Sequence, residues 1–228
     1  YPLRRQRQMC IRDSHKSSAK TGFWRSVHHN DIAFARESFL DEYAEALGMD
    51  PVALRSQIYS EPLLVNVMEK AVETSGWGSP LPEGRARGLG CFSAWDATHV
   101  AEVAEVSVAD NSRIRVHKIV CAVDCGVVIN PNIIKEQMEG GIAFALSAML
   151  GKEITIKDGQ IEQSNFDGFP ILRINEMPEV EVHILPNSRD PKGIGEMAGP
   201  PLLAAAANAV YALTGKRLRQ LPFRLNDS

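Results

Sequence analysis

One segment places a carboxylate between glycines, which is a pattern that can do chemistry. Residues 192–201 (KGIGEMAGPP) carry Glu196 with Gly195 directly before it. Glycines let the backbone approach a ligand closely, and the start of the helix that follows favours an ionised carboxylate. Such a carboxylate in a tight pocket can act as a general base. A surface turn with a solvated glutamate has the same spacing, and the spacing alone favours that simpler interpretation.

A second candidate segment runs from residue 123 to residue 141. VDCGVVINP at 123–131 predicts a strand that ends in a polar turn and leads into a helix, on which QMEGG follows at 137–141. The free N–H groups at the start of such a helix can hold a phosphate. In the alternative, Asp124 and Asn130 only satisfy the backbone. Cys121 and Cys125 lie four residues apart on one strand face, and we interpret them as buried small side chains rather than as metal ligands.

A third candidate is Arg25, in the segment TGFWRSVHHN. An arginine stacked beside Phe23 and Trp24 could orient a planar or anionic ligand, or it could anchor the start of a helix. These two interpretations are equally supported. The histidines show no spacing typical of a zinc site, so no metal-ligating side chain is predicted.

The elements that must position these residues follow from the apolar pattern. A helix that begins at Asn30 or Asp31 is expected to bury the apolar side chains spaced three or four apart, namely Ile32, Ala35, Phe39, Tyr43 and Leu47. Further helices are expected to start at Pro51, Pro62, Pro131 and Pro200, with a loop over 76–90. Glycines 140 and 141 suggest close packing against their helix. Strands are expected at 91–95, 99–108, 113–123 and 180–185, with a small hairpin before the last. This order predicts an α+β fold with a largely antiparallel or mixed sheet and packed helices.

The composition sets wider limits. The chain has 228 residues, 25 Lys+Arg against 28 Asp+Glu and 44% hydrophobic residues, which is typical of a globular protein and not of a polybasic nucleic-acid binder. No apolar run is long enough for a transmembrane segment. We interpret 1–20 as a non-native or disordered tail, because YPLRRQRQMCIRDS resembles translated adapter sequence. We interpret the chain as part of a longer polypeptide.

Several segments together resemble one known family. The sequence is similar to the C-terminal part of the large subunit of molybdenum hydroxylases, the xanthine dehydrogenase and aldehyde oxidase family, and within it to the branch of the isoquinoline 1-oxidoreductase beta subunit. The resemblance runs in order from Thr21 to Phe223. It rests on TGFWRSV, AVDCGVVINP, QMEGGIAFALSAML, SNFDGFPILRINEMPEVEVHIL, GIGEMAGPP and NAVYALTGKRLRQLP.

The resemblance implies a molybdopterin-binding domain, with 21–87 as its helical segment and 88–228 as its α+β part. Glu196 matches the family's base, which removes a proton from a metal-bound hydroxide before the oxygen attacks an electron-poor carbon. Arg25 lies near a substrate-orienting arginine, in a motif that is richer in glycine in relatives. The residues that match cofactor-holding segments are Cys125, Gly126, Asn130, Gln137 and Gly195.

The resemblance also implies partners. The cofactor is expected to be a molybdenum pterin in its cytosine dinucleotide form, completed by upstream parts of the same polypeptide. Electrons are expected to pass to iron–sulfur clusters on a small partner subunit, because the cysteines here match no cluster motif. The substrate is expected to be an N-heteroaromatic ring of the isoquinoline type. The alternatives are an aldehyde oxidoreductase and a cofactor-free scaffold with the same fold. The isolated fragment is expected to be inactive and to expose apolar surface where missing parts would pack.

Overall fold

A four-stranded sheet forms the centre of the computed structural model, which describes residues 22–94, 97–109, 112–151 and 153–225. The strands are β1 (Arg85–Ala94), β2 (Thr98–Val108), β3 (Ile114–Asp124) and β6 (Glu179–Ile184), in the order β1-β2-β3-β6. The first three are antiparallel, whereas β6 runs parallel to β3. The predicted α+β class with a largely antiparallel or mixed sheet is confirmed. The tail at 1–20 lies outside the described residues.

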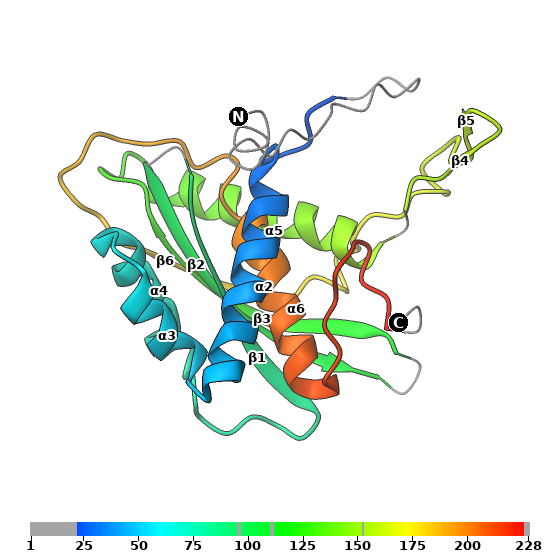
Figure 1. Cartoon of the computed structure of the whole chain (residues 1–228). Helices are drawn as coiled ribbons and strands as arrows, with labels where there is room; N and C mark the ends of the chain where they lie inside the picture. The colour runs from blue at the N-terminus through cyan, green and yellow to red at the C-terminus, as the bar shows by residue number, and fades with distance from the viewer. Residues whose placement is uncertain (1–21, 95–96, 110–111, 152, 226–228) are drawn as a thin grey trace, which may run out of the picture.

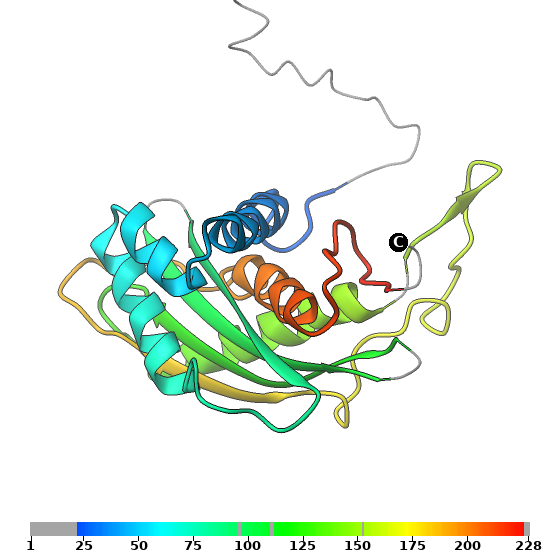
Figure 2. The same ribbon diagram turned by 60° about the horizontal axis from the view of Figure 1, so that its bottom comes forward.

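Helices cover both faces of this sheet (Figures 1 and 2). On one face lie α5 (Pro131–Leu150) and α6 (Gly199–Thr214), which share the larger apolar core with the strands, and α2 (His29–Leu47) packs against α6. The other face is covered by α4 (Pro62–Ser75), which follows α3 (Pro51–Ile58). A short hairpin, β4 (Ile156–Lys157) and β5 (Gln160–Ile161), projects from the body. Within the described ranges no helix is long and apolar enough to cross a membrane.

The first strand begins earlier than predicted. The sequence predicts a loop up to residue 90, but β1 already starts at Arg85, so this expectation is wrong. Gly88 and Gly90 explain the difference, because a Cβ at Gly88 would lie 2.2 Å from the Ala205 carbonyl oxygen, and one at Gly90 would lie 2.1 Å from the Pro201 carbonyl oxygen. These glycines let α6 lie directly on the strand.

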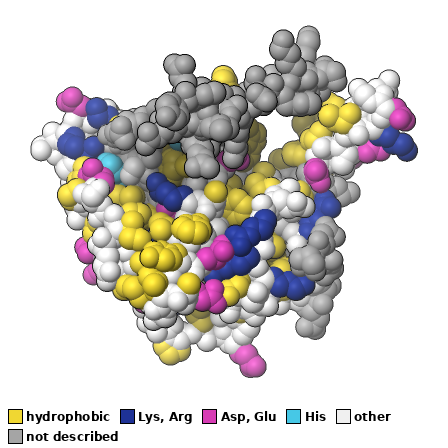
Figure 3. All heavy atoms as spheres, viewed as in Figure 1, with side chains coloured by type: hydrophobic (Ala, Val, Ile, Leu, Met, Phe, Trp, Pro, Cys, Tyr) yellow, Lys and Arg dark blue, Asp and Glu magenta, His cyan; other side chains and the backbone are white. Residues whose placement is uncertain are grey.

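Helix α2 forms as predicted but buries a different face. It starts at His29, and no side chain caps its first turn. The buried side includes Ala33, Leu40 and Ala44, which meet α6 and the sheet. The predicted apolar stripe instead faces solvent and contributes to the hydrophobic surface in Figure 3; its exposed large members are Ile32, Phe39, Tyr43 and Leu47. The apolar periodicity alone therefore gave the wrong buried face.

The other helix ends follow local sequence rules. The Asp50 carboxylate accepts hydrogen bonds from Val52 N–H and Ala53 N–H at the start of α3. Gly48 and Gly215 end α2 and α6 in the left-handed conformation, with φ values of 64° and 68°. Helix starts predicted at Pro51, Pro62 and Pro131 are confirmed.

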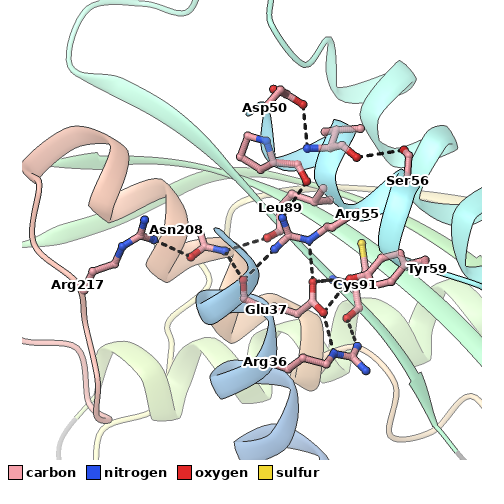
Figure 4. Close-up of polar contacts among 12 residues, drawn as sticks. Arg36, Glu37, Asp50, Arg55, Ser56, Tyr59, Leu89, Cys91, Asn208 and Arg217 are labelled. Carbon is pink, nitrogen blue, oxygen red and sulfur yellow. Dashed lines mark hydrogen bonds and ion pairs between the residues drawn. The ribbon is translucent and has the colours of Figure 1, made fainter. Parts of the chain in front are cut away.

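A buried charged cluster joins α2, α3 and β1 (Figure 4). The Glu37 and Arg55 side chains are fully buried, with Arg55 Nε 2.9 Å from Glu37 Oε2. The Tyr59 hydroxyl donates to the same carboxylate at 2.8 Å, and Cys91 N–H donates at 3.2 Å. Burial lowers the pKa of Arg55, but the charge interactions with Glu37, Tyr59 and Cys91 together with the hydrogen bond to Glu37 raise this pKa overall. Arg55 therefore stays charged inside the protein.

Candidate active site

Three segments far apart in the sequence converge on the Arg25 guanidinium. Arg25 Nε donates to the Gly195 carbonyl oxygen at 2.7 Å, and Arg25 Nη2 donates to Gln137 Oε1 at 3.1 Å. Arg25 precedes α2, Gln137 lies on α5, and Gly195 lies in the loop before α6. The structure thus brings together four of the predicted site residues: Arg25, Gln137, Gly195 and Glu196.

Helix α5 presents a small residue to this cluster. A Cβ at Gly141 would lie 2.9 Å from the Ala198 Cβ and 3.4 Å from the Arg25 guanidinium carbon. Gly141 follows Gln137 by one helical turn, so both residues lie on one face of α5. At Gly140 a Cβ would meet nothing within 4 Å. The close packing suggested by the two glycines therefore holds at Gly141 and not at Gly140.

Glu196 is held by Ser26, which the sequence analysis did not single out. Ser26 N–H donates to Glu196 Oε1 at 3.1 Å, and Ser26 Oγ donates to the Glu196 backbone carbonyl at 2.5 Å. Ser26 is 1% exposed, whereas Glu196 is half-buried and reachable from solvent. Ser26 and Val27 both have positive φ, at 75° and 51°, and nothing in the sequence signals this in a non-glycine pair.

Residues next to Arg25 and Ser26 in the chain add two further features. Burial and the neighbouring His28 lower the pKa of His29, and the Glu196 carboxylate opposes this shift. On the side of Arg25, the Trp24 and Phe144 rings stack with centroids 4.8 Å apart and planes 26° apart. Phe144 lies on α5 one turn after Gly141, so the site has a partly exposed aromatic edge.

The turn after β3 packs against the start of the loop that carries Gly195 and Glu196. Gly126, with φ 81°, packs so closely that a Cβ would lie 2.4 Å from the Asp190 carbonyl oxygen. Lys192 N–H donates to the Cys125 carbonyl at 2.8 Å. The Asp124 carboxylate forms an ion pair with this loop, in which Arg189 Nη2 lies 2.7 Å from Asp124 Oδ1. The loop at 189–196 therefore connects the turn with the Arg25–Glu196 cluster.

Asn130 lies at the start of α5. Its Oδ1 accepts hydrogen bonds from Asn132 N–H at 3.0 Å and Ile133 N–H at 3.3 Å. The helix start thus has protein partners for these two donors, as in the alternative weighed from the sequence. Its predicted role toward a cofactor stays a prediction.

Three cysteines lie within the part of the chain that the structure describes. Cys91, Cys121 and Cys125 are free and buried, and burial raises the pKa of each thiol. No cluster of three possible metal ligands occurs among the described residues.

The donor set is suitable for an oxygen-rich cofactor rather than a directly ligated metal. Arg25 uses Gln137 Oε1 as an acceptor, which turns the amide NH₂ group of Gln137 toward other partners. Gly195 is exposed and has no side chain to block a ligand. Pterin ring edges and phosphates offer the acceptors that such amide donors bind, so these residues fit a pterin cofactor.

Comparison with known proteins identifies the family of the chain. Residues 26–178 match the family described as the molybdopterin cofactor-binding domain. The chain is 32% identical over 214 residues to the isoquinoline 1-oxidoreductase beta subunit of Brevundimonas diminuta, covering 92% of this chain and 27% of that protein. It is 31% identical over 221 residues to a nicotinate dehydrogenase subunit of Pseudomonas putida, covering 89% of this chain and 19% of that protein.

A solved structure shares the fold. The aldehyde oxidoreductase of Desulfovibrio gigas superposes with a TM-score of 0.69 at 14% identity, over 87% of this chain and 40% of that one. The chain spans less than a third of the length of the isoquinoline 1-oxidoreductase and nicotinate dehydrogenase subunits. The family match covers most of the chain and includes Ser26 and Gln137. This chain belongs to the molybdopterin cofactor-binding domain family.

Proposed function

We propose that this chain is the C-terminal part of a molybdenum hydroxylase catalytic subunit, with Glu196 as its general base. The observation that carries the proposal is the convergence of Glu196 with Arg25 and Gln137 from three separate segments. A solvated glutamate in a surface turn has no need of such anchoring. Glu196 instead is fixed at its backbone and at one carboxylate oxygen.

The chain's own residues have distinct tasks in this proposal. Gln137, Gly195 and the turn at Cys125 and Gly126 hold the pterin cofactor. When bound, the molybdenum cofactor supplies the oxygen-transfer and two-electron chemistry of the family. Glu196 accepts a proton at Oε2, the oxygen that does not take part in the bond from Ser26 N–H. Arg25 fixes the loop through the Gly195 carbonyl and thereby the position of the base.

We propose an N-heteroaromatic ring as the substrate, hydroxylated with oxygen derived from water. Two relatives named for such rings, isoquinoline and nicotinate, support this choice. The stacked Trp24–Phe144 edge also favours a flat aromatic ligand over a small aliphatic one. In this proposal the pterin carries a cytosine dinucleotide, upstream parts of the polypeptide complete the pocket, and electrons leave to a small iron–sulfur subunit.

The test compares the wild type with Glu196→Gln in the full-length subunit, co-expressed with its iron–sulfur partner. Molybdenum is measured by elemental analysis, and dye reduction is measured with quinoline-type and aldehyde substrates. We expect one molybdenum per subunit in both proteins and loss of at least 100-fold in kcat in the variant. A folded complex without molybdenum would support a scaffold. Faster turnover of aldehydes than of heteroaromatic rings would overturn the proposed substrate.

A further inference from the structure

We infer that Ser26 is a positioning residue that orients the Glu196 carboxylate. The inference rests on the proposed function of Glu196 as the base. Ser26 contacts Glu196 at two points, the carboxylate Oε1 and the backbone carbonyl oxygen. Two attachments on one residue fix both the peptide plane and the side-chain torsions between them, which a single hydrogen bond does not do.

The backbone at Ser26 has an energetically unfavourable conformation that makes this contact possible. The φ values of Ser26 and Val27 are 75° and 51°, and left-handed backbone is unfavourable for residues other than glycine. Strained residues of this kind cluster at functional sites, where the surrounding structure holds them in place. Here two turn bonds do so, from Val27 N–H to the Trp24 carbonyl and from His29 N–H to the Ser26 carbonyl, both at 2.9 Å.

A serine at this position adds something that a glycine could not. Glycine would adopt the positive φ without strain, but it has no hydroxyl to bond the Glu196 carbonyl. Serine therefore has a less favourable backbone conformation than glycine would have at this position, but it forms a second hydrogen bond to Glu196. Because Ser26 is 1% exposed, solvent cannot replace this hydrogen bond.

The neighbouring contacts keep Ser26 in register with the loop. Asn30 Nδ2 donates to the Arg25 carbonyl at 2.7 Å. Gly199, at the start of α6, approaches so closely that a Cβ would lie 2.9 Å from Asn30 Oδ1 and 3.6 Å from Ser26 Oγ. Asn30 on α2 and Gly199 on α6 thus hold the Glu196 loop against the Ser26 turn, although neither residue takes part in the proposed reaction.

The first experiment measures the contact by amide hydrogen exchange in the full-length subunit that contains this chain. We expect the Ser26 amide to exchange at least tenfold faster in Glu196→Ala than in the wild type, because its acceptor is gone. Glu196→Gln retains an Oε1 acceptor and is expected to keep the protection. Equal Ser26 exchange rates in the wild type and Glu196→Ala would overturn the inference.

The second experiment measures kcat and KM separately in the cofactor-loaded enzyme that contains this chain. We expect Ser26→Ala to lower kcat at least tenfold with KM within twofold, because the base is misplaced while the remaining substrate contacts persist. Ser26→Gly also lacks the hydroxyl but relaxes the backbone, so it supplies a folded variant if Ser26→Ala does not fold. The same kcat loss is expected in it.

The matched control is Ser56→Ala, which removes a similar hydroxyl bond, from Ser56 Oγ to the Val52 carbonyl at 3.0 Å on α3. It is expected to leave kcat and KM unchanged. Wild-type kcat in both Ser26 variants, with activity lost in Glu196→Gln, would overturn the positioning role alone. Full activity in Glu196→Gln would instead overturn the proposed function, while the exchange experiment would still report on the Ser26 contact.

Discussion

Replacing Arg55 by methionine is expected to destabilise the protein strongly. The Glu37 carboxylate is fully buried, and Arg55 is its fully buried ionic partner (Figure 4). In Arg55→Met the carboxylate keeps the Tyr59 hydroxyl, Cys91 N–H and the half-exposed Arg36. Burial in particular raises the pKa of Tyr59, so its hydroxyl remains a neutral donor that cannot compensate for the lost cation.

The magnitude follows from the type of pair. Removing one partner of a buried ion pair costs about 3–5 kcal/mol, a large share of the roughly 5–15 kcal/mol that stabilises a typical domain. With a urea m value of about 2 kcal/mol/M, the unfolding midpoint of Arg55→Met is expected to fall by about 2 M. Circular dichroism during urea titration measures this shift.

Two further variants separate the pair from general side-chain loss. Adding Glu37→Gln to Arg55→Met removes the buried charge, which then has only the half-exposed Arg36 as an ionic partner, and is expected to recover at least about 1 kcal/mol. Arg219→Met breaks a pair with Glu42 in which the arginine is 62% exposed, and about 1 kcal/mol or less is expected. The reasoning would be refuted if Arg55→Met cost no more than Arg219→Met, or if Glu37→Gln destabilised Arg55→Met further.

Three other predictions concern packing and pH. Gly140→Ala is expected to raise the free energy of unfolding by about 0.5–1 kcal/mol. Gly141→Ala is expected to lower it, because the new Cβ would lie 2.9 Å from the Ala198 Cβ. Thermal unfolding measures both variants, and a change of the same sign in the two would contradict this prediction. Gly88→Ala, placing a Cβ 2.2 Å from the α6 backbone, is expected to cost at least about 1–3 kcal/mol in the same assay, and a neutral result would argue against the close β1–α6 contact. Burial raises the pKa of Glu102 well above its usual 4.5, so the folded state keeps a proton that the unfolded state loses, and stability should fall by up to about 1.4 kcal/mol per pH unit as the pH rises above 4.5. Glu102→Gln should flatten this dependence in urea titrations at pH 5 to 8, and unchanged slopes would show that Glu102 is not its source.

Local features of the chain could be predicted from the sequence because they depend on neighbouring residues only. The cap at Asp50 and the left-handed glycine at 48 each act within about one turn of the backbone. The α+β class followed from the order of periodic segments. The Glu196 loop was found from its glycines and carboxylate, and the resemblance of the surrounding segments gave the family before any contact was known.

The tertiary structure decided what these elements meet. Periodicity placed Phe39 on the buried face of α2, but α6 packs on the other side, and Phe39 is 62% exposed. The meeting of Arg25 with Gln137 joins residues 112 apart, and that of Ser26 with Glu196 joins residues 170 apart. No local rule encodes such contacts, because they depend on how three helices and a loop stack on one sheet. The sequence thus determined which residues could do chemistry, and packing determined which of them lie together.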